Sequence, residues 1–205
     1  MKPSPPSRRR VWTGGGSGDF WQNPVYVIII INFMIFIAAL IDKVKIISNL
    51  GLSPSLFTEK PWTIITNMFV HAEFWHIFGN MITLFFFGRV IYQLLGSGRF
   101  LLLYFGGGIL GNLLYIWLGT PLSIAIGASG AVYALAGALV VMMPTMRVAI
   151  WGIMPLWVVV LLFFGVWSIP NFIPGVAWQA HLGGLAAGLI AGFFFRKTMR
   201  YIYYR

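Results

Sequence analysis

The sequence predicts an all-α polytopic membrane protein with six transmembrane helices. Three observations support this: 59% of the 205 residues are apolar, only 9% are charged, and the charges lie mostly at the two ends. A soluble domain carries about 25% charged residues, so the composition excludes an ordinary soluble globule. It also excludes a disordered chain, which needs the opposite bias. The absence of cysteine excludes disulfides, thiolate metal sites and a cysteine nucleophile.

The gaps between charged residues locate the spans. A helix needs about 20 mainly apolar residues to cross the hydrocarbon core of a bilayer. No Asp, Glu, Lys or Arg falls between Asp19 and Asp42, between Arg99 and Arg147, or between Arg147 and Arg196. Turn-forming residues near 120 and 170–175 divide the last two gaps into two spans each. The six predicted spans cover residues 24–41, 74–94, 100–118, 126–143, 150–168 and 178–195.

The basic ends predict the orientation. Lys and Arg are enriched on the cytoplasmic side of membrane proteins, so both termini are expected in the cytoplasm. Residues 1–22 are expected to be a disordered basic tail, 23–196 the six-span domain and 197–205 a short basic tail. The net charge of +10 then indicates membrane topology rather than a nucleic-acid partner. No small-x-small cleavage site follows the first apolar run, so we expect an uncleaved first span.

A few polar side chains interrupt or border these apolar spans. Strongly polar groups are expensive in lipid, so each is a candidate functional residue. All three histidines of the chain are among them. The set is His71, His76, Asn80, Asn112, Ser129, Gln179 and His181.

The segment Gly127-Ala128-Ser129-Gly130 opens an apolar helical run and places Ser129 near a helix N-terminus. The flanking Gly127 and Gly130 let another chain approach the hydroxyl closely. Free N–H groups at the helix start could stabilise a developing oxyanion. The alternative is a serine N-cap with glycines used for packing.

His181 begins the last span and shares a face with a stripe of small residues. That stripe is Gly184, Gly188 and Gly192, and the helix that starts at Ser129 has a matching one in Gly130, Ala134 and Ala138. Small residues let two membrane helices come close. Packing the two stripes together would bring Ser129 and His181 to the same depth. The alternative is a glycine zipper that serves packing alone.

Together these residues predict nucleophilic catalysis. A neutral histidine is the usual base for a serine hydroxyl. All four acids precede the third span, so we expect a Ser129–His181 dyad rather than a triad. Tyr133, four residues after Ser129, could pack on the imidazole. His76 and Asn80 share a helical face and could donate to the oxyanion with the Ser129 N–H, or could simply bond a neighbouring helix.

Three motifs resemble those of the rhomboid intramembrane serine proteases. They are His71-x4-His76-x3-Asn80, Gly127-Ala-Ser129-Gly130 with Tyr133, and Ala180-His181-Leu-Gly-Gly. The resemblance covers about residues 24–195, and the three motifs together are specific. One departure is Trp62-Thr63, where members often have Trp-Arg in the first outer loop.

The resemblance implies a six-helix core whose active site opens to water from the outer side. It implies that Ser129 is the nucleophile and His181 the base, that His76 and Asn80 support the oxyanion, that Tyr133 packs on the histidine and that His71 is structural. The implied substrates are transmembrane proteins within the lipid bilayer, and no metal or cofactor is required. We expect a substrate helix to enter past the fifth span, where Trp157, Phe163, Phe164 and Trp167 would form a bulky gate.

Four other functions stay open on the sequence alone. His76 and His181 could be axial ligands of a haem, which leaves Ser129 unexplained. The three histidines could bind zinc, although His71 and His76 are five residues apart, a poor common helical face. The polar residues could line a transport path. The chain could also be a catalytically silent rhomboid relative that only binds membrane proteins.

Overall fold

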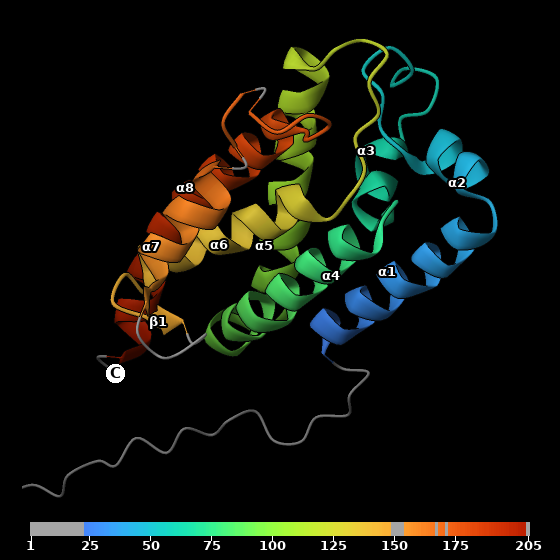
Figure 1. Cartoon of the computed structure of the whole chain (residues 1–205). Coiled ribbons are helices and arrows are strands. Elements are labelled where there is room, and N and C mark those ends of the chain that lie inside the picture. Colours follow the sequence, from blue (N-terminus) through green and yellow to red (C-terminus); the bar gives the residue numbers. More distant parts are fainter. Residues whose placement is uncertain (1–22, 149–153, 167, 171, 204–205) are drawn as a thin grey trace, which may run out of the picture.

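The computed structural model describes residues 23–148, 154–166, 168–170 and 172–203. The predicted tail of residues 1–22 lies outside them. The described part is mostly helical, as predicted, and its elements pack into a bundle (Figure 1). In chain order they are α1 (Pro24–Ile41), α2 (Lys43–Leu50), α3 (Thr63–Thr66), η2 (Asn67–Phe69), α4 (Phe74–Thr83), η3 (Leu84–Gly88), α5 (Arg89–Leu118), α6 (Ser129–Met142), β1 (Arg147–Val148), β2 (Met154–Pro155), α7 (Leu156–Val159), η4 (Val160–Gly165) and α8 (Trp178–Tyr203).

Within the described residues, three helical runs are long and apolar enough to cross a membrane: Pro24–Ile41, Phe74–Leu118 and Trp178–Lys197. The middle run contains both predicted spans at 74–94 and 100–118, because α4, the π-helical η3 and α5 follow one another directly. The chain bends inside α5 at Gly96, whose backbone is non-helical with φ 79°. Glycine tolerates this conformation because it has no Cβ.

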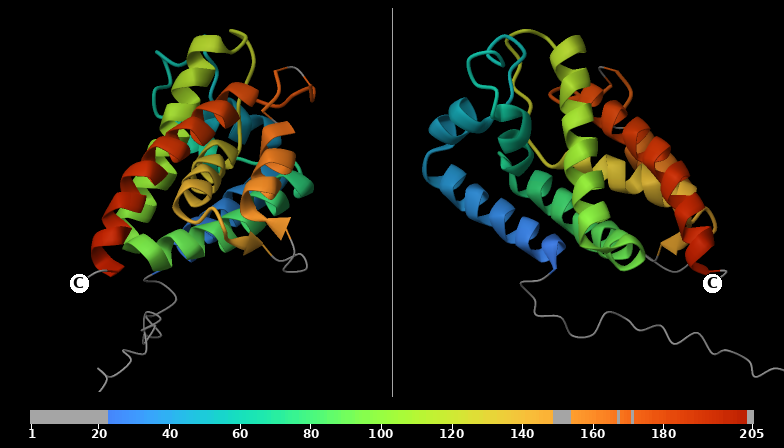
Figure 2. Two further views of the ribbon diagram at one scale, coloured as in Figure 1. Left: turned by 90° about the vertical axis from the view of Figure 1, so that its left-hand side faces the viewer. Right: turned by 180° about the vertical axis from the view of Figure 1, so that it is seen from behind.

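Helix α6 forms the centre of the bundle. Every residue from Gly130 to Leu139 is buried, as expected for a helix that is apolar on all sides. Figure 2 shows α6 between α8 and α7, with α5 alongside. Residues 126–128 of the predicted span at 126–143 precede the helix, because the chain turns at Gly127 and the helix begins at Ser129.

The predicted span at 150–168 is shorter in the structure. Arg147–Val148 and Met154–Pro155 pair as a two-stranded antiparallel hairpin, and helix begins only at Leu156. Pro155 has an extended backbone and occupies the N-cap position, where a residue without an N–H does no harm. The α7–η4 helix therefore covers only the later part of the predicted range; residues 149–153 and Trp167 lie outside the described residues.

The long connection after α1 is folded against the rest of the protein. Asp42 ends α1, and its side chain accepts from the Lys45 N–H to start α2. Further on, Leu52 and Ala125 exchange backbone hydrogen bonds of 3.0 and 2.8 Å. The Trp62 indole donates to the Asn49 carbonyl at 3.0 Å. This loop thus braces the segment that leads into α6.

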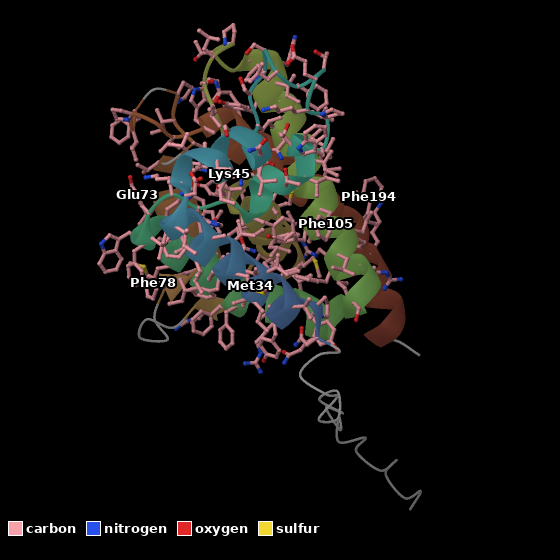
Figure 3. All side chains as sticks on the ribbon, turned by 90° about the vertical axis from the view of Figure 1, so that its right-hand side faces the viewer. Met34, Lys45, Glu73, Phe78, Phe105 and Phe194 are labelled. Atoms are coloured by element: carbon pink, nitrogen blue, oxygen red, sulfur yellow. The ribbon has the colours of Figure 1, made fainter. Side chains whose placement is uncertain are left out.

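Large apolar side chains cover the outside of the bundle. Figure 3 shows Met34 of α1, Phe78 of α4 and Phe194 of α8 at the surface, and their exposed fractions are 64%, 45% and 61%. A soluble monomer rarely exposes a large contiguous apolar patch. An apolar exterior of this kind is suited to contact with lipid, as is the apolar composition of the helices themselves.

Candidate functional site

The small-residue stripes of α6 and α8 face each other, as the sequence predicts. A Cβ added to Gly184 would collide with the Gly130 backbone, and one added to Gly188 would collide with the Ala134 backbone. At Gly192 an added Cβ would lie 2.7 Å from the Ala138 carbonyl oxygen. The two backbones therefore pack in direct contact along three successive turns, which glycine alone permits here.

This close packing joins Ser129 to His181. Ser129 is the first residue of α6, and His181 lies in the first turn of α8. The His181 Nε2 atom lies 2.8 Å from the Ser129 Oγ atom, within hydrogen-bond distance. His181 is 7% exposed and Ser129 is partly buried, so the histidine is largely shielded from solvent while the serine keeps some exposure. Burial strengthens such a bond and limits the freedom of both groups.

Tyr133 packs against the face of the His181 imidazole. Its ring stacks on His181 with centroids 4.2 Å apart and an interplanar angle of 17°. The edge of the same tyrosine meets Phe164 of η4 at 4.6 Å, and Phe164 in turn stacks on Phe87 of η3 at 6.0 Å. A column of rings thus connects the histidine to the two π-helical segments. Phe164 is buried in this column, and Trp157 is half exposed.

The turn before Ser129 is held by two hydrogen bonds that it donates to the segment preceding α4. The Gly127 N–H donates to the Asn67 carbonyl at 2.9 Å. The Ala128 N–H donates to Nε2 of His71 at 3.4 Å. Gly127 has φ 115°, and a Cβ there would lie 2.6 Å from Nε2 of His76. Only glycine satisfies both the backbone conformation and the contact with the imidazole.

His71 is fully buried beside this turn. Burial lowers the pKa of His71 to about 3, and the neighbouring His76 adds to the shift. The two imidazoles meet edge to face, with centroids 4.8 Å apart. A neutral His71 has an unprotonated nitrogen that can accept the Ala128 N–H, which is the form its burial favours.

Asn80 and His76 also lie together on α4. The Asn80 Nδ2 atom donates to the His76 carbonyl at 2.9 Å. An amide nitrogen carries two protons, so this bond uses one of them. Asn80 is 8% exposed and His76 is partly buried beside Gly127. The structure therefore brings His71 and His76 to the Gly127–Ala128 turn and His181 and Tyr133 to Ser129, with Asn80 beside His76 on α4. Gln179, also named from the sequence, instead donates to the Leu118 carbonyl.

Two contributors to this region are given no part in the predicted dyad or oxyanion site, although Asn112 is among the polar candidates. Asn67 supplies the carbonyl that holds Gly127, and the Asn112 side chain bonds the Asn67 side chain. Asn112 stands out in the sequence as an amide inside an apolar run, whereas Asn67 precedes the apolar span and gives no such signal.

The zinc alternative requires the three histidines to converge on one ion. Among residues 23–148, 154–166, 168–170 and 172–203, no group of three or more His, Cys, Asp or Glu side chains is placed to share a metal. The haem alternative requires a free His181 Nε2 atom, and that atom faces the Ser129 hydroxyl.

Comparisons with a family model and with known proteins agree on one family. A rhomboid domain model matches residues 58–198. YdcA of Bacillus subtilis, which bears the rhomboid protease name, is 34% identical over 144 residues, covering 68% of this chain and 71% of the relative. The mitochondrial rhomboid protein 1 of Saccharomyces cerevisiae is 28% identical over 203 residues, covering 87% of this chain and 55% of the relative.

The rhomboid protease GluP of Bacillus subtilis is 28% identical over 137 residues, which cover 63% of this chain and 25% of the relative. The chain thus spans about half or less of the length of the yeast protein and GluP. The domain match nevertheless covers more than half of the chain and includes all the site residues described above. With its apolar helices, the chain is an integral multi-pass membrane protein, and it belongs to the rhomboid family of intramembrane serine proteases.

Proposed function

We propose that this chain is an intramembrane serine endopeptidase that cleaves transmembrane segments of membrane proteins with a Ser129–His181 dyad. The observation that supports it most strongly is the 2.8 Å contact between His181 Nε2 and Ser129 Oγ. A hydroxyl at this distance can pass its proton to a neutral imidazole as it attacks a carbonyl. Stacking on Tyr133 restricts rotation of the imidazole, which keeps Nε2 near the hydroxyl.

The reaction follows from that geometry. Ser129 Oγ bonds to the scissile carbonyl carbon while its proton moves to Nε2 of His181. The imidazolium then donates this proton to the leaving amine as the C–N bond breaks, which leaves an acyl ester on Ser129. A water molecule, deprotonated by the same Nε2 atom, attacks the ester, and the proton returns to Ser129 Oγ as the acid product leaves.

The oxyanion is stabilised from three directions in this proposal. The Ser129 N–H lies at the start of α6, where helix N–H groups have no partner within the helix. Asn80 supplies the amide proton that the His76 carbonyl does not use, and His76 supplies a ring N–H. Loss of one such donor costs about 2.7–4 kcal/mol in known serine hydrolases.

The same proposal includes six membrane spans with both termini in the cytoplasm. In Figure 1 the start of α1, the β1–β2 hairpin and the end of α8 lie at one end of the bundle, and the loops around α2 and α3 lie at the other. The first end carries Arg147 of β1 and the basic residues Arg196 and Lys197 near the end of α8. An excess of positive charge marks the cytoplasmic side, so Ser129 and His181 lie toward the opposite, outer side.

The substrate class follows from the place of the site within the bundle. A transmembrane helix hides its carbonyls in internal hydrogen bonds, so it must unwind before Ser129 can reach one. Helix-weakening residues near the outer end of the substrate lower the cost of unwinding. The α7–η4 helix, which meets the site through Phe164, is the element that would move aside to admit it.

The test is labelling of the detergent-solubilised protein with a fluorophosphonate probe, which reacts with activated serines. We expect labelling of the wild type at Ser129 and none in Ser129→Ala or His181→Ala. Labelling that persists in Ser129→Ala, or a folded wild type that does not react, would contradict the dyad and favour a silent relative that only binds membrane proteins.

A further inference from the structure

A pair of buried asparagines lies behind the turn that presents Ser129. Asn67 belongs to η2 and Asn112 to α5, and their exposed fractions are 1% and 3%. Each amide donates to the other: Asn67 Nδ2 to Asn112 Oδ1 at 3.1 Å, and Asn112 Nδ2 to Asn67 Oδ1 at 2.8 Å. These two hydrogen bonds, one donated by each asparagine, fix the position of η2 relative to α5.

Asn112 also forms a hydrogen bond with α3, the helix that precedes η2. Its Nδ2 atom also donates to the Ile64 carbonyl of α3 at 2.7 Å. The residue before it, Gly111, packs so closely on α8 that an added Cβ would lie 2.5 Å from the Ala180 carbonyl oxygen. Ala180 precedes His181, so the turn of α5 that holds Asn67 also supports the backbone that carries the histidine.

Asn67 is bonded in turn to the segment that precedes Ser129. Its carbonyl accepts two N–H groups, from Val70 at 3.1 Å and from Gly127 at 2.9 Å. The Val70 bond closes the end of η2, and the Gly127 bond holds the turn that precedes α6. Gly127 is pressed on its other side by the His76 imidazole. The position of the Asn67 carbonyl therefore sets the direction in which the chain enters α6.

We propose that Asn67 and Asn112 are positioning residues for catalysis: they hold the Gly127–Ala128 turn so that the Ser129 N–H points at the oxyanion. The inference rests on the proposed serine chemistry. Neither asparagine touches the reacting atoms; both act through the backbone of the turn. Misplacement of a catalytic group by about 1 Å can cost about 100-fold in rate, so loss of the pair should slow acylation strongly.

A purely structural role would give a different pattern across three variants. Asn67→Leu or Asn112→Leu leaves one buried amide without its partner, which destabilises the fold. The double variant removes both amides, so its thermal stability should recover toward the wild type. A structural pair would then recover its reactivity as well, whereas a positioning pair would not.

The experiment measures the second-order rate constant for fluorophosphonate labelling and the unfolding temperature of each variant in detergent. Hydrogen exchange of the 126–130 segment reports on the turn itself. The control is Asn32→Leu, which removes another fully buried asparagine, on α1, whose Nδ2 atom donates within its own helix to the Ile28 carbonyl. We expect the control to label at the wild-type rate.

In the Asn67→Leu/Asn112→Leu variant we expect a recovered unfolding temperature, a labelling rate about 10-fold to 100-fold below the wild type, and faster exchange at Gly127. Wild-type labelling by this double variant would overturn the positioning role and leave the serine chemistry intact. A wild type that does not label would overturn both proposals together.

Discussion

At the residue scale, the reactivity of Ser129 depends on how firmly His181 is held. Its Nε2 atom lies 2.8 Å from Ser129 Oγ, and its ring stacks on Tyr133 with centroids 4.2 Å apart. Stacking restricts rotation of the imidazole about its side-chain bonds. The contribution of Tyr133 should therefore come from its ring more than from its hydroxyl.

Two substitutions at Tyr133 separate these contributions. Tyr133→Phe keeps the ring and should label with fluorophosphonate at a rate close to the wild type. Tyr133→Leu removes the stacking partner and should slow labelling by about 10-fold or more, because a small displacement of the base is costly. Equal rates for the two variants would show that the stack is not needed for the orientation of His181.

His71 gives the protein a stability that depends on pH. Its pKa is lowered from 6.5 to about 3 by burial, so the unfolded chain binds a proton between these values and the folded protein does not. Stability is therefore full above about pH 6.5 and is lost as pH falls toward 3, by up to about 1.4 kcal/mol per pH unit.

The unfolding temperature measured from pH 7 to pH 4 tests this contribution. His71→Gln keeps an acceptor for the Ala128 N–H but has no titrating group. We expect the variant to lose less stability than the wild type as the pH falls. Parallel curves for the two proteins would show that His71 does not titrate in this way.

At the element scale, the contact of α6 with α8 decides whether the site exists. A methyl group at Gly188 would strike the Ala134 backbone, whereas one at Gly106 of α5 would meet nothing within 4 Å. Overpacking of this kind costs about 1–3 kcal/mol. The two glycines thus provide a matched pair within the same bundle.

We expect Gly188→Ala to lower the unfolding temperature and slow fluorophosphonate labelling, because α8 must shift and carry His181 away from Ser129. Gly106→Ala should be neutral or slightly stabilising, since alanine favours helix. Both measurements use the same detergent preparation. A Gly188→Ala protein with wild-type stability and labelling would refute the claim that this close packing builds the site.

The elements also show what the sequence could predict. The bounds of α1 follow from an apolar run that starts after Asn23 and ends at Asp42, and the pairing of α6 with α8 follows from the glycine spacing. The late start of α7 does not follow from the sequence pattern. The pairing of Arg147–Val148 with Met154–Pro155 depends on tertiary contacts that the pattern of an apolar segment does not reveal. The role of Asn67 depends on partners 45 and 60 residues away, which a local pattern does not contain.

At the scale of the whole molecule, the site is enclosed by helices, so a substrate helix needs a way in. The Phe87–Phe164 stack at 6.0 Å marks where η3 faces η4. The chain has no cysteine, so a pair introduced beside this contact would be the sole site for a thiol crosslink. We expect crosslinking to abolish cleavage of a transmembrane substrate while fluorophosphonate labelling of Ser129 continues.

Reduction of the crosslink should restore cleavage, and each single-cysteine variant is the matched control. Undiminished cleavage by the fully crosslinked protein would show that substrates do not enter between η3 and η4. The result separates access to the site from the chemistry within it, since the small probe and the substrate helix use the same serine.

The most direct measurement is proteolysis in a bilayer. The full chain is reconstituted into liposomes with single-span substrates that carry helix-weakening residues near one end of the span, and the products are mapped by mass spectrometry. We expect a cut within or at the edge of the apolar segment by the wild type and none by Ser129→Ala or His181→Ala. Cleavage that survives Ser129→Ala, or a labelled wild type that cuts only soluble segments, would contradict intramembrane proteolysis by this dyad.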